Sequence, residues 1–152
     1  MAFPNMFKQE VTDKIIDRIN KLTPETAQLW GKMGVAQMLA HCSVTYEMIY
    51  DNTHPAPKGL MKLMLKWLIK GKVVSETPYK KNNPTAPAFV VKDERKFEIE
   101  KYRLINYLKK TQQLGEQEFH NKASHSFGPL TKTEWNNMFY KHLDHHLSQF
   151  GV

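Results

Sequence analysis

Two histidines one helical turn apart near the C-terminus have the types and spacing that most clearly suggest chemistry. His142 and His146 occupy positions i and i+4 in the sequence H-L-D-H-H-L-S-Q-F-G, so on a helix both rings project from the same face. That face also carries Trp135, Met138 and Phe139, and we therefore expect the two rings to point toward the protein interior. Imidazole is the most common metal ligand in proteins, and this spacing lets two of them converge on one ion.

A third ligand must come from elsewhere in the chain, because a catalytic metal site usually combines three protein ligands with one open position. His41 is the best candidate, since it lies in the middle of a predicted helix between Met38 and Cys42 on the face expected to be buried. His145 is offset from His142 by roughly 60° and from His146 by roughly 100°, so we interpret it as a neighbour of the site.

The spacing of the histidines is also compatible with other interpretations. A histidine pair near a helix end can be a surface feature, since the C-terminal dipole favours protonated imidazole there. A single buried histidine such as His41 is more often a hydrogen-bonded core residue than a ligand.

Four main helices are predicted to position these residues. Apolar periodicity places them over residues 5–20, 35–50, 92 or 93 to about 115, and 131–150. The last begins with a capping box, T-K-T-E at 131–134, and a short extra helix is expected over 60–69. Residues 73–87 and 116–129 are expected to be irregular, and the one strand candidate is 88–91. We therefore predict a single all-α domain over residues 1–152, a four-helix bundle with one short extra helix.

Composition excludes several classes of protein. One cysteine in 152 residues cannot form an internal disulfide, and no apolar run is long enough for a membrane-spanning helix. No signal peptide is evident, so a cytoplasmic location is expected. The net charge of +7 invites a nucleic-acid partner, but the chain has no recognised nucleic-acid-binding motif and we expect none.

Three segments of the chain resemble the DinB/YfiT-like metalloenzyme superfamily, and most closely one of its uncharacterised branches. They are W-G-K-M-x-V-A-Q-M-L-A-H-C at 30–42, L-T-x-x-E-W at 130–135 and Y-K-H-L-D-H-H-L-S-Q-F-G-V at 140–152. The resemblance implies a DinB-like four-helix bundle in which His41, His142 and His146 hold a divalent metal ion. It also implies hydrolase chemistry or transfer of a low-molecular-weight thiol on a small-molecule substrate, and it suggests a homodimer.

The ligand set indicates the chemistry that a bound ion would supply. Three neutral imidazoles leave the ion its full charge, so it can lower the pKa of bound water toward ~7 or deprotonate a thiol. Zn, Ni and Fe all suit three histidines. Gln149 can support His146 from outside the ligand set, while His125 and His145 are candidates for the catalytic proton donor. The alternative is a non-catalytic, stress-related bundle that binds a metal or another ligand.

A lysine-rich segment, residues 58–70, is not part of this predicted metal site. Lys58, Lys62, Lys66 and Lys70 recur every four residues among Leu, Met and Trp. The favoured interpretation is a solvated lysine stripe whose apolar residues pack on the bundle, so membrane contact is not expected. A lid over the metal pocket, a dimer face and a helix lying on an anionic membrane are the alternatives.

Overall fold

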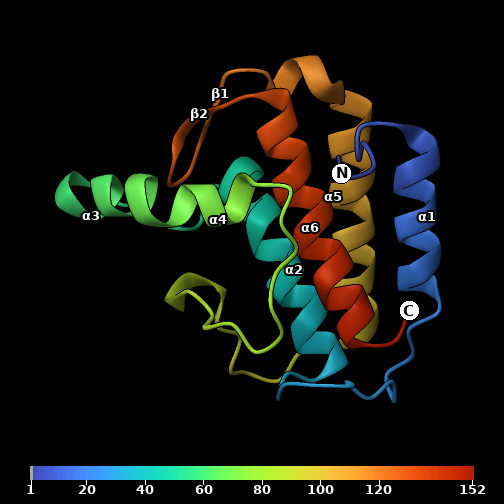
Figure 1. Cartoon of the computed structure of the whole chain (residues 1–152). Coiled ribbons are helices and arrows are strands. Elements are labelled where there is room, and N and C mark those ends of the chain that lie inside the picture. Colours follow the sequence, from blue (N-terminus) through green and yellow to red (C-terminus); the bar gives the residue numbers. More distant parts are fainter. Residues whose placement is uncertain (1) are drawn as a thin grey trace.

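Four long helices form the body of the protein in the computed structural model, which describes residues 2–152 (Figure 1). They are α1 (Gln9–Asn20), α2 (Val35–Tyr50), α5 (Phe97–Phe119) and α6 (Lys132–Gln149). Helices α2, α5 and α6 contact one another, and α1 packs on α5 and α6. The protein is therefore mainly helical, and a small sheet is its second kind of secondary structure. Among the described residues, no helix combines the length and apolar character needed to cross a membrane.

Aromatic side chains fix α6 against its neighbours. Phe119 from α5 packs edge-on against Trp135 and Phe139 from α6, with ring centroids 5.4 and 5.6 Å apart. Tyr46 from α2 stacks on Phe139 at 5.2 Å. These four rings are 0–1% exposed, and aromatic side chains of this size contribute strongly to core stability. The core thereby sets how α2 and α6 face each other.

The two helices that carry the histidines begin at the residues that local signals indicate. Helix α2 spans 35–50 as predicted. At the start of α6, Thr131 Oγ1 accepts a hydrogen bond from Glu134 N–H at 3.2 Å, and the Glu134 carboxylate accepts one from Thr131 N–H at 2.9 Å. This reciprocal pair is the predicted capping box.

The strand prediction for residues 88–91 is wrong. Pro87–Phe89 forms a short 3-10 helix, η2, and the sheet lies instead in the segment 116–129 that was expected to be irregular. There β1 (Lys122–Ser124) pairs antiparallel with β2 (Gly128–Leu130). The Ser124 hydroxyl accepts from Phe127 N–H and donates to the Gly128 carbonyl, so side-chain bonds close the turn.

The long helix α5 differs from its prediction at both ends. It begins at Phe97, not at residue 92 or 93, and it continues past Gly115 to Phe119. Gly115 does leave helical geometry, with φ 75° and ψ 164°, as expected of a glycine at a helix end. A further turn follows and ends at Phe119, which is fully buried and packs against Trp135 of α6.

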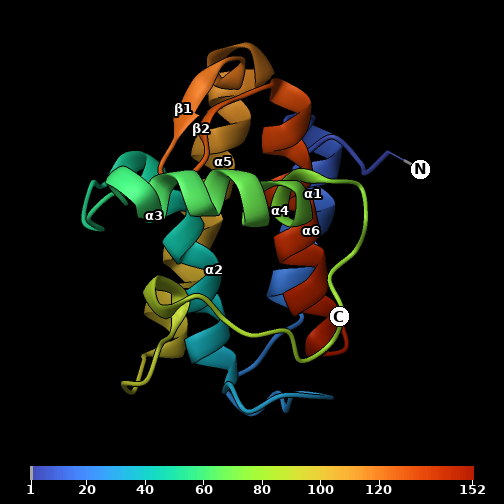
Figure 2. The same ribbon diagram turned by 60° about the vertical axis from the view of Figure 1, so that its left-hand side comes forward.

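A helical arm projects from this body (Figures 1 and 2). The arm consists of α3 (Gly59–Met64), the π-helical turn η1 (Leu65–Ile69) and α4 (Lys70–Val74). Helix α4 packs on α6, whereas no residue of α3 or η1 is buried. The expectation that the apolar residues of this segment pack on the bundle is therefore wrong.

Candidate metal centre

Three histidine rings from two helices meet inside the protein. His41 comes from α2, and His142 and His146 come from α6. One nitrogen of each ring lies within 4.8 Å of the others, and the Nε2 atoms of His41 and His142 are 2.9 Å apart. Residues separated by about a hundred positions in the chain thus form one cluster, which could hold a metal ion.

In each ring, the second nitrogen is engaged by a group outside the cluster. His41 donates its Nδ1 proton to the Phe89 carbonyl at 2.8 Å. The Nδ1 atom of His146 is 2.9 Å from Gln149 Oε1, and that of His142 is 3.2 Å from Thr45 Oγ1. Partners of this kind fix the ring orientation of metal-binding histidines, and here they leave Nε2 of each ring facing the cluster.

The environment keeps all three rings uncharged. His41 is 4% and His146 is 9% exposed, while His142 is partly exposed. Burial lowers the pKa of His41 and, together with repulsion from His41, lowers the pKa of His146 to about 3. Burial and the two neighbouring rings hold the pKa of His142 well below its usual range. Neutral imidazole is the form that binds a metal ion.

The spacing of the nitrogens is close to what an ion requires. A tetrahedral Zn²⁺ with Zn–N bonds of ~2.0–2.1 Å separates its ligand atoms by about 3.3 Å. The observed 2.9 Å between His41 and His142 lies just below that value, and the 4.8 Å limit for the whole set lies above it. Small side-chain rotations therefore suffice, and the donor set fits a divalent transition metal.

Phe89 covers one side of the cluster, a role that was not predicted from the sequence. Its ring packs on His41 and His142 at 5.5 and 5.8 Å, in addition to the hydrogen bond from His41 to its carbonyl. The residue lies in η2, within the long connection between the arm and α5. The proline residues around it mark a loop, but no local spacing relates that loop to α2.

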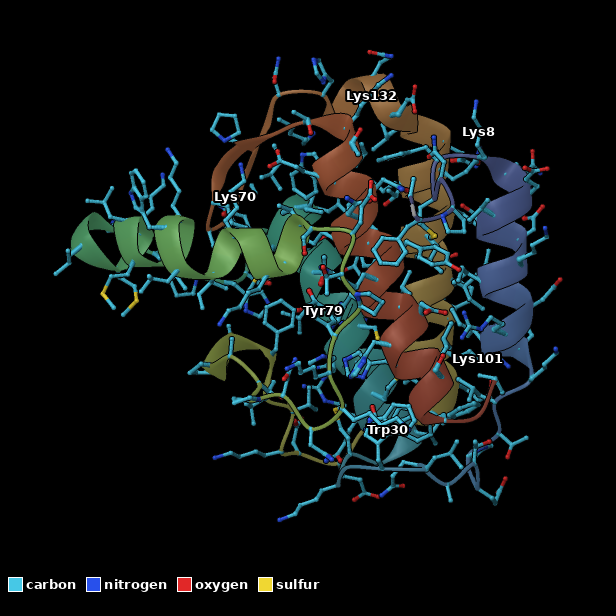
Figure 3. All side chains as sticks on the ribbon, viewed as in Figure 1. Lys8, Trp30, Lys70, Tyr79, Lys101 and Lys132 are labelled. Atoms are coloured by element: carbon cyan, nitrogen blue, oxygen red, sulfur yellow. The ribbon has the colours of Figure 1, made fainter. Side chains whose placement is uncertain are left out.

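His145, a predicted candidate for proton transfer, lies beside the cluster on a different face of α6. Its ring packs against His146 at 5.0 Å, Tyr79 at 5.8 Å and Trp30 at 6.0 Å. A cavity of about 180 Å³ lies there, lined by Trp30, Tyr79, Lys141, His145 and others. Figure 3 shows Trp30 and Tyr79 beside α6. His145 thus faces this cavity, whereas His41, His142 and His146 face one another.

His125, the other candidate, is not brought to the cluster. It lies in the turn of the β1–β2 hairpin, where its Nε2 is 3.1 Å from the His54 carbonyl and its Nδ1 is 2.9 Å from the Ser126 hydroxyl. These contacts tie the hairpin to the loop after α2. Its proposed proton transfer at the metal site has no geometric support.

Gln149 connects the cluster to the loop that precedes α2. Besides its contact with His146, its side-chain N–H donates to the Trp30 carbonyl at 2.7 Å, and its backbone carbonyl accepts from Leu29 N–H at 2.8 Å. Gly31 follows in the left-handed region at φ 82°, and a Cβ there would lie 2.6 Å from the Gln149 amide nitrogen. A loop distant in sequence thereby determines where Gln149 can sit.

Comparison with known proteins identifies a family that the chain matches over almost its whole length. A family model described as "Protein of unknown function (DUF1569)" covers residues 4–151. No curated protein and no solved structure matches the chain.

Proposed function

Because the chain belongs to the DUF1569 family, whose description gives no activity, we propose a function from the site itself. His41, His142 and His146 hold a divalent transition metal ion, Zn, Ni or Fe, and the protein is a metal-dependent enzyme that acts on a small molecule. The resemblance to the DinB/YfiT-like superfamily supports the same ligand set and a DinB-like four-helix bundle.

The orientation of the three rings is the observation that carries the proposal. Each Nδ1 has its own partner outside the cluster, namely Phe89, Thr45 or Gln149. Burying three imidazoles side by side costs free energy that apolar side chains would not, and an ion bound between them offsets that cost. Because their pKa values are lowered, the three imidazoles are unprotonated, which is the form that binds a metal ion.

When bound, the ion supplies Lewis-acid chemistry, which brings the pKa of water or of a thiol toward neutrality. The protein's own residues hold the ion with uncharged ligands and screen one side with Phe89. His142 is the least buried residue of the three, so we expect a small molecule to approach the ion from its side. Both hydrolysis and thiol transfer are compatible with these features, and a low-molecular-weight thiol is one substrate class to test.

Metal analysis tests the ligand set. We expect the purified protein, loaded with Zn²⁺, Ni²⁺ or Fe²⁺ and passed through a desalting column, to retain a stoichiometric ion. His142→Ala should lose it, because two remaining imidazoles hold a divalent ion poorly. His120→Ala is the matched control, since His120 is exposed and outside the cluster. Equal retention by wild type and His142→Ala would contradict the proposal.

A second experiment separates an enzyme from a non-catalytic metal-binding bundle. Co²⁺-loaded protein is titrated with a small thiol while its visible and near-ultraviolet absorption is recorded. A new sulfur-to-cobalt charge-transfer band indicates an open coordination position and supports the enzyme. An unchanged spectrum, together with no turnover of ester or thiol–electrophile pairs, favours the non-catalytic bundle.

A further inference from the structure

The arm Gly59–Val74 exposes an apolar surface that no other part of the described chain covers. Seven large apolar side chains on it are more than a third exposed, and Trp67 reaches 77%. The others are Leu60, Met61, Leu63, Met64, Leu68 and Ile69. Soluble monomers rarely expose contiguous apolar patches of more than a few hundred Å², so this surface indicates a binding partner.

The arm is also strongly basic. Lys62, Lys66 and Lys72 are exposed along it, and Lys58 is exposed directly before it. The sequence contains no Asp or Glu between Asp51 and Glu76. In α3, at ~100° per residue, Leu60 and Met64 share one face while Lys62 lies roughly on the opposite one. Trp67 and Lys66 belong to the π-helical turn η1, where that angle does not apply, and both are exposed. An apolar face with aromatic and aliphatic residues and a lysine-rich polar face characterises helices that lie in a membrane interface.

We propose that the arm docks on the surface of an anionic lipid bilayer. Its apolar face enters the boundary between headgroups and acyl chains, with Trp67 at the level where tryptophan concentrates in membrane proteins. The lysine stems extend along the helix so that their ammonium groups reach lipid phosphates. Each lysine near such a surface contributes about 1 kcal/mol, or about fivefold in affinity.

Charge distinguishes a bilayer from a second copy of the chain. In a helix pair, residues that flank the apolar seam face each other across the interface, and opposite charges there favour pairing. All charged side chains of the arm are lysines, so two arms in contact would bring like charges near each other with no acidic partner. An anionic bilayer instead complements both the apolar and the basic surface.

The base of the arm is fastened to the body, so docking does not require local unfolding. Lys141 donates two hydrogen bonds, to the carbonyls of Lys72 and Ser75, both at 2.8 Å. Lys70 forms a salt bridge with Glu134 at 2.9 Å. The arm therefore presents its outer part, α3 and η1, beyond the helices of the body (Figure 1).

Vesicle sedimentation tests the proposal with the full chain. We expect binding to vesicles of equimolar phosphatidylcholine and phosphatidylglycerol, little binding to phosphatidylcholine alone, and a blue shift of tryptophan emission that Trp67→Gln abolishes. Lys62→Gln with Lys66→Gln should weaken binding about 25-fold. The matched control, Lys14→Gln with Lys109→Gln, removes the same charge from exposed positions on α1 and α5 and should change binding little.

Three outcomes would overturn it. One is the absence of binding to anionic vesicles. Another is binding that both double variants weaken equally, or that Trp67→Gln leaves intact, since general attraction between the basic protein and negative charge explains it. The third is a dimer by light scattering that Trp67→Gln dissociates, without vesicle binding, because the arm is then a self-association surface.

Discussion

At the scale of single residues, the candidate centre depends on the groups that contact its three histidine rings on the side away from the cluster. Phe89, Thr45 and Gln149 each contact the Nδ1 atom of one histidine. Phe89 contributes a backbone carbonyl, so substitution leaves that contact in place. Gln149 contributes a side chain and is therefore the partner whose removal is most informative.

Gln149→Ala should weaken metal binding about 10–100-fold, the usual effect of removing a group that orients a ligand. Gln149→Glu keeps an oxygen acceptor for His146 but loses the N–H that donates to the Trp30 carbonyl, so it should restore only part of the affinity. Competition with a chromophoric chelator measures both values. Unchanged affinity in Gln149→Ala would show that the ring of His146 needs no support.

The site residues were predictable to different degrees, for physical reasons. The i,i+4 spacing of His142 and His146 is a local property of one helix, and the apolar neighbours of His41 indicated its inward orientation. The contribution of Phe89 was not predictable, because a backbone carbonyl in a loop leaves no mark in the sequence. His125 lies in the turn of the β1–β2 hairpin. Because the hairpin was not predicted, the location of His125 could not be predicted either.

At the scale of elements, the loop before α2 closes the C-terminal end of α6. It meets Gln149 through the backbone of Leu29 and Trp30, and Gly31 allows this approach by adopting a positive φ. The end of α6 that carries His146 is thereby joined to the start of the helix that carries His41.

Gly31→Ala should destabilise the protein by about 1–2 kcal/mol, because an L-residue is strained in the left-handed region. It should also weaken metal binding, since the new Cβ displaces the Gln149 amide. Gly34→Ala is the matched control, with its nearest neighbour 3.8 Å away and φ −71°. Urea denaturation and chelator competition measure the two effects, and equal behaviour of both variants would refute this account.

Elements with strong local signals were predicted better than those that depend on distant contacts. Helices α2 and α6 follow from apolar periodicity and a capping box. The turn of the hairpin is closed by hydrogen bonds of the Ser124 hydroxyl. Its strands have three residues each, too few to show the alternation of apolar and polar residues that indicates a strand. A helix was predicted for most of the arm from its own residues. Its exposure could not be predicted in the same way, because exposure depends on which other parts of the chain pack beside the arm.

At the scale of the whole molecule, the buried cluster makes stability depend on pH when no ion is bound. In the unfolded chain a histidine has a pKa near ~6.5, whereas in the folded protein the pKa of His146 is about 3 and that of His142 is also lowered. As the pH falls below ~6.5, the unfolded state takes up protons that the folded state does not. The stability present above that pH is therefore progressively lost on acidification.

We expect the urea midpoint of the metal-free protein to fall between about pH 7 and about pH 5. His146→Gln should show a shallower decline, because one of the groups with a lowered pKa is gone. The exposed His120→Gln serves as the comparison. A midpoint that falls equally steeply in His146→Gln would assign the pH dependence to other groups.

The hydrogen bonds from Lys141 to the base of the arm have a consequence for communication within the molecule. Lys141 directly precedes His142 on α6, so the residue that fastens the arm adjoins a residue of the metal cluster. A displacement of the arm that moves Lys141 would therefore act on α6 at the residue next to His142. If the arm binds lipid and the cluster binds an ion, any factor by which lipid changes the metal affinity must equal the factor by which the metal changes the lipid affinity.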